Sequence, residues 1–415
     1  MNFMFAEPWW KRALRALSPA NPAWLVVFAS LALTLLGLYC INISRGFSTV
    51  ELAELTGVPA AVNKAGIGAG AYSRQLVYFA VGILAAIIVA TPNYRLWGVL
   101  STALGITTLL LLIFLLLPFI PTWIVKPKNG ARGWIQFGVA DFQPAEMAKI
   151  VYVIVIAWYL RYRENHRRFL GLVPIGLLTM VPVGLITLQP DLGSALLFIP
   201  SLFAMLVAAG AKLRHLTIIV LVGAMAAPLS YPVLRPHQKQ RLVGLWKQFT
   251  GDTTGDRDIN FQSNAAQTLI GAGGTSGTST EKSRALLHFN ALPERHNDMI
   301  TAVIGNRFGM AGLAAVMSLY LLWVVGALWV AGRARDAFGR LIPVGLAGFI
   351  GGQALVNLAM NVGLAPIVGV TLPYVSFGGS SMLSAWIMVG LVFSVSLRSD
   401  ARLFKKPFEF DADQP

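Results

Sequence analysis

The sequence is poor in charged residues and in cysteine, and both shortages restrict what the protein can be. Asp, Glu, Lys and Arg make up 12% of the 415 residues, whereas 56% are hydrophobic. Soluble domains carry about 25% charged residues, so the composition excludes an ordinary soluble protein and indicates a polytopic membrane protein. Cys40 is the only cysteine and therefore cannot form an internal disulfide. Its position in an apolar run favours a packing role.

Three further features are missing from the sequence. No small-residue cleavage site follows the first apolar run, which is long enough to span a membrane, so we expect no cleavable signal peptide. No clear internal repeat is present, which disfavours an inverted-repeat transporter. His296 has no second His or Cys at ligand spacing, and we therefore predict no zinc site.

Apolar runs of the length that a membrane helix needs, about 20 residues, recur along the whole chain. They predict an all-α polytopic membrane protein with about ten transmembrane helices. The run at 299–331 is too long for one span, so this helix is expected to start later or to tilt. The predicted ranges are 23–43, 75–91, 96–120, 144–160, 169–188, 192–210, 215–234, 299–331, 341–363 and 381–397.

Lys and Arg are distributed unequally between the two sides of these helices. With the N-terminus inside, about seventeen basic residues fall on cytoplasmic segments and about six on the short outer segments. The net charge of +15 is thus a sign of membrane topology, with no nucleic-acid partner. We predict that both termini are cytoplasmic. The predicted parts are an N-terminal segment (1–22), helices one to seven (23–234), a large extracytoplasmic loop (235–298), helices eight to ten (299–397) and a tail (398–415).

The loop 235–298 is mostly polar and mixes acidic with basic residues. Segments this long without obvious secondary structure are usually functional or disordered; a solvated linker is the alternative reading. Gly271 to Ser279 is typical of a flexible stretch. A short helix on the membrane surface is also predicted, because five apolar residues fall at helical spacing: Leu242, Val243, Leu245, Trp246 and Phe249.

Two polar clusters lie before or at the start of the fourth predicted helix. In the first, Arg132 can bind an anion and Trp134 can anchor at the interface; an ordinary interfacial turn is the alternative. In the second, Glu146 and Lys149 are three residues apart and share a helix face. Ionisable groups at membrane depth are costly and normally face the protein interior. A structural ion pair is the alternative to a functional one.

Three more polar clusters follow. Asp191, between the fifth and sixth helices, is either a site residue or a helix cap. Glu294, Arg295 and Asp298 come directly before the eighth helix, and capping accounts at most for Asp298. In Gly369–Ser381, glycines and a proline break the helix at membrane depth. The N–H groups of this segment, which includes Ser380, could form an anion-binding nest.

In this order, the segments Gln143–Lys149, Gln189–Gly193, Leu292–Ile300 and Gly369–Ser381 resemble the signature blocks of the SEDS family of RodA, FtsW and SpoVE. The resemblance covers most of the chain and is closest to RodA at residues 292–296. It implies a peptidoglycan glycosyltransferase that polymerises lipid II, an undecaprenyl-diphosphate-linked disaccharide peptide, for cell elongation and shape. The implied location is the outer face of the bacterial cytoplasmic membrane. The implied partners are a class B penicillin-binding protein and other elongation or division proteins. A lipid II flippase and a non-catalytic scaffold are the alternatives.

The family has an essential aspartate in its long outer loop, within an Asp-Pro block that this chain lacks. Phe261, ten residues before Gly271, takes the place of the family's tyrosine, so the aspartate would fall at Gly255. Asp256, one residue away, is therefore the predicted catalytic base; Asp252 and Asp258 are the alternatives.

The predicted reaction needs a carboxylate to take a sugar hydroxyl proton and positive charge to stabilise the departing diphosphate. Arg132, Lys149 and Arg295 are candidates for the second task. A Mg²⁺ or Mn²⁺ ion could share it, but the sequence shows no distinct metal site. The predicted substrate-binding residues are Arg132, Trp134, Glu146, Lys149, Asp191, Glu294, Arg295, Asp298 and Ser380.

Overall fold

The computed structural model describes most of the chain. The described residues are 18–19, 21–44, 70–125, 127, 131–138, 141–233, 236–250, 260–290 and 292–398. Most of the predicted N-terminal segment and nearly all of the predicted tail lie outside these ranges. The three candidate bases Asp252, Asp256 and Asp258 also lie outside them.

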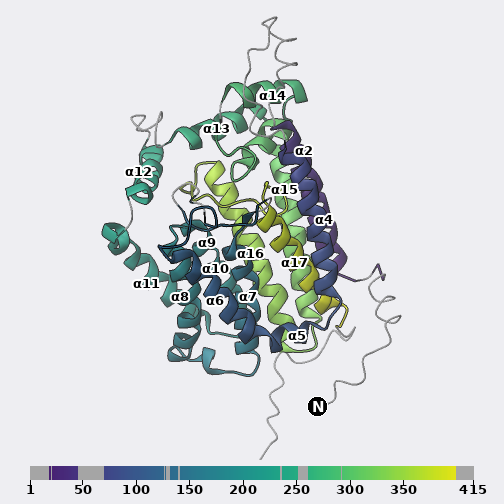
Figure 1. Cartoon of the computed structure of the whole chain (residues 1–415), viewed down its shortest axis with the longest axis vertical. Coiled ribbons are helices and arrows are strands. Elements are labelled where there is room, and N and C mark those ends of the chain that lie inside the picture. The colour runs from purple at the N-terminus through teal and green to yellow at the C-terminus, as the bar shows by residue number, and fades with distance from the viewer. Residues whose placement is uncertain are drawn as a thin grey trace, which may run out of the picture.

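Apolar helices form the body of the protein (Figure 1). Within the described ranges, six helices are long and apolar enough to cross a membrane: α2 (Ala23–Ile43), α4 (Ala71–Ala90), Leu170–Leu188, α15 (Ile300–Gly332), α16 (Ala337–Asn361) and α17 (Gly379–Ser396). The span Leu170–Leu188 comprises the short helix η2 (Leu170–Leu172) and α8 (Val173–Leu188).

Shorter helices occupy the other predicted ranges. They are α5 (Tyr94–Val99) with α6 (Ser101–Leu116), α7 (Pro144–Leu160), α9 (Leu192–Leu196) with α10 (Phe198–Ala208), and α11 (Leu213–Ala226) with η3 (Ala227–Val233). Each of the ten predicted ranges therefore contains helix, and the prediction of an all-α polytopic membrane protein is confirmed. A further short helix, η1 (Asn165–Arg167), follows α7. The described β-structure is one antiparallel pair, β1 (Ile135–Gln136) and β2 (Asp141–Phe142).

Helix α16 lies at the centre of the bundle, in contact with α15, α10 and α7, while α17 packs along α4. Small residues allow these close approaches. A Cβ at Gly390 of α17 would collide with the backbone of Ala86 on α4, and one at Gly348 of α16 would collide with Ser201 on α10. Helix α11 is peripheral, and the largely exposed apolar side chains on it suit contact with lipid.

The long helix α15 is broken rather than shortened. At Gly309 the backbone has φ +67° and ψ −162°, a conformation that is essentially restricted to glycine. The break frees N–H groups on its C-terminal side. Those of Met310 and Ala311 donate to the carbonyls of Gly274 and Thr275 at 2.9 and 3.1 Å. The apolar run at 299–331, which is too long for one span, is thus divided by a kink. The carbonyls of the turn after α13 accept hydrogen bonds from the N–H groups that the kink frees.

The loop between α11 and α15 is more ordered than the sequence predicts. It contains α12 (Pro236–Thr250), α13 (Phe261–Gly273) and α14 (Thr280–Phe289), so the predicted short helix at 242–249 is confirmed. The prediction that Gly271–Ser279 is flexible is wrong. This stretch ends α13 and then turns against the kink of α15. A Cβ at Gly309 would collide with Thr275 and Gly277, and one at Gly277 would collide with Arg307 and Phe308.

The first prediction concerns this kink. Gly309→Ala should lower the free energy of unfolding by at least about 1–3 kcal/mol, because alanine is strained at this φ and its Cβ would meet Thr275 and Gly277. Thermal melting of the purified protein in detergent measures the change. Gly332→Ala, in open space at the end of the same helix, is the control and should melt like the parent. Equal melting of both variants and the parent would contradict the proposed role of the kink.

Candidate active site

A buried ion pair lies in the N-terminal half of α7. Glu146 and Lys149 are 5% and 1% exposed, and Lys149 Nζ lies 2.8 Å from Glu146 Oε1. Lys149 also donates to Gln353 Oε1 on α16 at 3.0 Å, and Ser384 Oγ on α17 donates to Glu146 Oε2 at 2.7 Å. Both charges are therefore compensated from three helices, as ionisable groups at membrane depth require.

Gln353 connects this ion pair to the segment between α16 and α17. Its Nε2 donates to the carbonyl oxygen and to Oγ1 of Thr371 at 2.9 and 3.2 Å. Thr371 Oγ1 in turn lies 3.3 Å from Ser381 Oγ. The backbone from 362 to 378 is not helical, which confirms the break predicted for Gly369–Ser381. Such backbone is tolerated at membrane depth where protein groups satisfy it.

Asp191 and Ser380 extend the same network. The Asp191 side chain caps α9 by accepting from Ser194 N and Ser194 Oγ at 3.0 and 2.7 Å. Gln143, directly before α7, donates from Nε2 to Asp191 Oδ2 at 3.3 Å. Its backbone N–H donates to Ser380 Oγ at 2.9 Å, and Ser380 donates to the Asp141 carbonyl. Asp191 is therefore both a helix cap and a neighbour of the α7 cluster.

The segment before α15 also meets the irregular 362–378 backbone. Asn357 Nδ2 on α16 donates to the carbonyls of Asp298 and Val370 at 2.9 and 2.6 Å. The position that a Cβ would take at Gly369 lies 3.7 Å from Asp298 Oδ2. The N-cap residue of α15 is Met299, without a side-chain capping bond, so the N-cap reading of Asp298 is wrong. Three polar clusters that are distant in sequence thus meet around the irregular backbone of a fourth.

Asp298 and Arg241 are close enough to interact electrostatically. Burial raises the pKa of Asp298 to about 7, and the nearby Glu294 carboxylate acts in the same direction. Burial lowers the pKa of Arg241 on α12, although the carboxylates of Asp298 and Asp191 both oppose that shift. Arg241 is close enough for both carboxylates to affect its pKa, yet it forms no ion pair with either of them within the described ranges. Its charge is therefore available to an anionic ligand.

Arg241 is a candidate site residue that the sequence analysis did not single out. On α12 the apolar side chains of Leu242, Trp246 and Phe249 are 42%, 70% and 62% exposed. Gln238 is buried on another face, and Gln248 Nε2 donates to Ser263 Oγ on α13 at 3.2 Å. Two polar side chains of this amphipathic helix, Gln238 and Gln248, thus turn towards the protein, while Arg241 between them is exposed. The polar side of α12 is the sequence pattern from which Arg241 could have been found.

Arg132 and Trp134 lie next to the β1–β2 pair, beside a small apolar cluster that includes Ile120 and Ile135. Arg132 Nη2 donates to the Ile120 carbonyl at 3.4 Å, while its buried Nε has no hydrogen-bond partner. The side chain of Trp134 is partly buried. In the described part of the chain, Arg132 has no direct bond to the Glu146–Lys149 network.

Glu294 and Arg295 hold the loop in shape. Glu294 has a φ of +50° and accepts a short hydrogen bond from Asn297 Nδ2. Arg295 Nη1 donates to the Leu287 carbonyl in the last turn of α14 at 2.6 Å. A cation is favourable at that helix end because the macrodipole is negative there. Arg295 is thus engaged with α14 rather than directed at the ion pair.

These observations define the class of the protein. It is an integral membrane protein with a helical bundle, and α12, α13 and α14 of the long loop lie at one end of that bundle (Figure 1). The buried charges and the irregular backbone form one candidate site. The chain belongs to the family described as cell cycle protein, FTSW_RODA_SPOVE, whose match spans residues 33–401.

Individual relatives agree with this assignment. Probable peptidoglycan glycosyltransferase FtsW of Trichlorobacter lovleyi is 32% identical over 331 residues, which are 79% of this chain and 84% of that protein. Stage V sporulation protein E of Bacillus subtilis is 27% identical over 78% of this chain and 86% of its own length.

Solved structures are also similar to the chain. A chain of a peptidoglycan synthase complex, solved in work on the coordination of polymerization and crosslinking, has a TM-score of 0.71 at 28% identity. It covers 90% of this chain and 97% of its own. RodA of Thermus thermophilus has a TM-score of 0.62 at 27% identity and covers 90% and 96%. The matches include both RodA and FtsW, so they support the family without singling out RodA.

The second prediction tests the buried ion pair. Lys149→Met should lower the free energy of unfolding by about 3–5 kcal/mol, because it leaves the Glu146 charge buried without a counter-ion. The double variant Glu146→Gln/Lys149→Met removes both charges and should recover most of that loss. Thermal melting in detergent measures both. If the double variant is as unstable as Lys149→Met alone, the uncompensated Glu146 charge is not the cause of the lost stability.

The third prediction concerns the pH dependence of Asp298. Its pKa in the folded protein, about 7, lies above the value of about 3.9 for an unfolded chain. The folded protein therefore holds this proton more tightly, and the contribution of Asp298 to stability is lost as pH rises from about 4 to about 7. Asp298→Asn should reduce the difference in melting temperature between pH 5 and pH 8. Glu281→Gln, which removes an exposed acid from α14, should leave that difference unchanged. If Asp298→Asn leaves the difference in melting temperature unchanged, the raised pKa of Asp298 is contradicted.

Proposed function

We propose that this protein is a peptidoglycan glycosyltransferase that polymerises lipid II at the outer face of the bacterial cytoplasmic membrane. Membership of the family and the names of its relatives support this activity. The observation that carries the proposal is the convergence of three polar clusters on the 362–378 backbone, which carries the fourth. A transferase that works on a lipid-linked sugar needs such a site at the membrane boundary.

In the proposed reaction, a hydroxyl of the acceptor sugar attacks the anomeric carbon of the donor while the lipid diphosphate leaves. A carboxylate takes the hydroxyl proton, and Asp256 stays our proposal for that base. The segment that contains it connects α12 to α13, and the Gln248–Ser263 hydrogen bond joins these two helices. A single base with direct displacement would invert the anomeric centre, by analogy with inverting hydrolases.

The departing diphosphate needs positive charge, and the structure supports a different order of candidates from the sequence. Lys149 is neutralised by Glu146, and Arg295 is bonded to the Leu287 carbonyl. Arg241 forms neither an ion pair nor such a hydrogen bond in the described residues. We therefore propose it as the principal diphosphate ligand, with Arg132 as a second one. Glu146, Lys149, Asp191 and Ser380 then support the site by fixing the helices around it.

The metal requirement remains a proposal as well. Among the described residues, no three Asp, Glu, His or Cys side chains gather at a spacing that could hold an ion. A Mg²⁺ or Mn²⁺ ion bound by the substrate diphosphate and one or two carboxylates would not need such a group of side chains.

Other observations support the proposed partner and the proposed orientation of the protein in the membrane. A similar solved chain belongs to a peptidoglycan synthase complex that coordinates polymerization with crosslinking, which supports a class B penicillin-binding protein as the partner here, together with other elongation or division proteins. The excess of basic residues supports cytoplasmic termini and an extracytoplasmic 235–298 loop. The role in cell elongation and shape is part of the same proposal.

The fourth prediction tests the enzyme directly with purified protein and lipid II. Asp256→Asn should lower the rate of polymer formation by at least about 100-fold, the lower end of a general base's contribution, while Asp252→Asn and Asp258→Asn lose less. If one of these two is inactive and Asp256→Asn is not, the base is a different aspartate. Full activity in all three variants would rule out a carboxylate base in this loop.

The same assay separates the alternative functions and tests Arg241. Arg241→Gln should also lose polymer formation, whereas Lys282→Gln, on the exposed face of α14, should retain it. Translocation of lipid II without polymer would support a flippase. A polymerisation-defective variant that still binds the penicillin-binding protein would exclude a scaffold role.

A further inference from the structure

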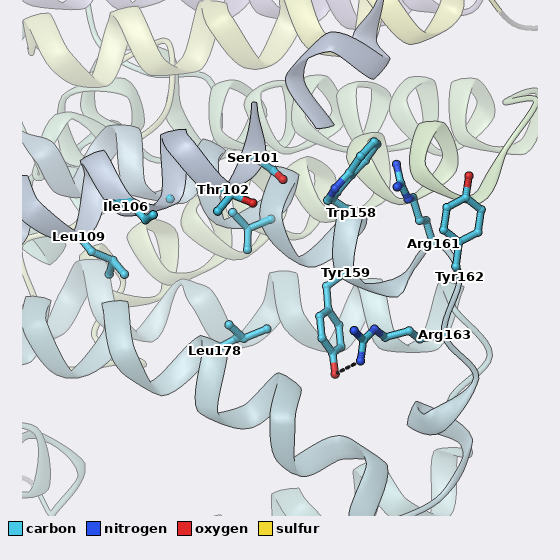
Figure 2. A pocket seen from close by; sticks show the side chains of 12 residues that line it. Ser101, Thr102, Ile106, Leu109, Trp158, Tyr159, Arg161, Tyr162, Arg163 and Leu178 are labelled. Carbon is cyan, nitrogen blue, oxygen red and sulfur yellow. Dashed lines mark hydrogen bonds between the residues drawn. The ribbon is translucent and has the colours of Figure 1, made fainter. Parts of the chain in front are cut away.

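A cavity lies between α6, α7 and α8, at the end of α7 opposite the ion pair. Its volume is about 590 Å³, within the usual range of roughly 300–1,000 Å³ for small-molecule sites. Figure 2 shows the side chains that line it, among them Ile106 and Leu109 from α6, Trp158 and Tyr159 from α7, and Leu178 from α8. Most of this lining is apolar or aromatic.

Two arginines line the cavity without a carboxylate partner. The Arg161 guanidinium is stacked between the rings of Trp158 and Tyr162. Arg163 lies over the ring of Tyr159, with its Cζ 4.3 Å from the centroid, and donates from Nη1 to the Tyr159 hydroxyl at 3.3 Å. Stacking on aromatic faces leaves most guanidinium N–H groups free in the plane of each side chain.

The nearest acids are already engaged. Asp336 lies 2.7 Å from Arg95 and also accepts from Tyr94. Glu164 is paired with Arg167 at 4.0 Å. Within the described ranges, neither Arg161 nor Arg163 forms an ion pair, and none of the residues that line the cavity is acidic. The cavity therefore has a net positive charge that an anion would neutralise.

The surroundings indicate where such an anion would come from. The apolar side chains of Ile106 and Leu178 at the cavity are 56% and 39% exposed, and the neighbouring Leu110 and Leu177 are 61% and 63% exposed. In a membrane these surfaces of α6 and α8 meet lipid chains. Basic pockets between membrane helices on the cytoplasmic side suit anionic lipid headgroups, and the distribution of Lys and Arg predicts that this end is cytoplasmic.

We propose that this cavity binds an anionic glycerophospholipid of the bilayer. The lipid phosphate lies between Arg161 and Arg163, and one acyl chain follows Ile106, Leu109 and Leu178. The aromatic rings hold the two guanidinium groups in position, which reduces the entropy lost on binding. This lipid site is separate from the proposed polymerase site and does not depend on it.

Native mass spectrometry of the purified full-length protein tests the proposal, with phosphatidylglycerol and phosphatidylcholine of the same acyl chains as probes. Arg161→Gln/Arg163→Gln should weaken phosphatidylglycerol binding by about 30-fold, with a factor of about five from each basic side chain near the membrane surface. Arg167→Gln/Arg168→Gln removes two charges from the same region without changing the cavity lining, and it should bind like the parent. Equal losses in both double variants, or equal affinity for the two lipids, would overturn the site.

A second variant tests the acyl-chain position while keeping both arginines. Gly105 lines the cavity, and a Cβ there would only touch Val155 at 3.4 Å, so Gly105→Leu should fold and fill the space. It should lose phosphatidylglycerol with an unchanged melting temperature; retained binding would overturn the proposal. Inorganic phosphate should not displace the lipid, because the acyl chain supplies part of the binding energy. Displacement by phosphate alone would indicate a site for a free anion.

Discussion

The cost of burying the Glu146–Lys149 pair constrains the rest of the bundle. Each charge at membrane depth needs a counter-charge and hydrogen bonds, and α7 supplies only the counter-charge. Gln353 on α16 and Ser384 on α17 supply the bonds. Two helices from the last part of the chain must therefore pack against α7 in one register, since a shift of either would leave a buried charge without its hydrogen-bond partner.

The same requirement extends to the irregular backbone between α16 and α17. Gln75 on α4 donates to the Ser376 carbonyl and accepts from the Gly378 N–H, both at 3.1 Å. Asn357 and Gln353 bond to the carbonyls of Val370 and Thr371. These buried amides replace the hydrogen bonds that a continuous helix would have made. Such a satisfied network is rigid, so the candidate site is held by side chains from several helices rather than by a mobile loop.

Some arginines have a counter-charge or a hydrogen-bonded carbonyl within the protein and others do not. This difference separates structural from ligand-binding arginines. Arg95 is paired with Asp336, and Arg295 is bonded to the end of α14. Arg241 above the polar site, and the Arg161–Arg163 pair at the other end of α7, have no ion pair in the described residues. A cation that is partly desolvated and unpaired gains most from an anionic ligand. Arg241 and the Arg161–Arg163 pair lie where a lipid-linked diphosphate and a bilayer phospholipid, respectively, are proposed to bind.

Hydropathy alone determined the class of the protein and the helical ranges, because the bilayer demands about 20 apolar residues for each span. Helical spacing placed Glu146 with Lys149 and predicted α12. The sequence did not determine the kink at Gly309, the ordered turn at 274–279, the engagement of Arg295 or the position of Arg241. Each of these depends on how another segment packs against the residue after folding, as the Gly274 and Leu287 carbonyls do for Met310 and Arg295, and such contacts leave no periodic pattern in the sequence. Only the packing of the helices decided which of the predicted polar residues meet at one site.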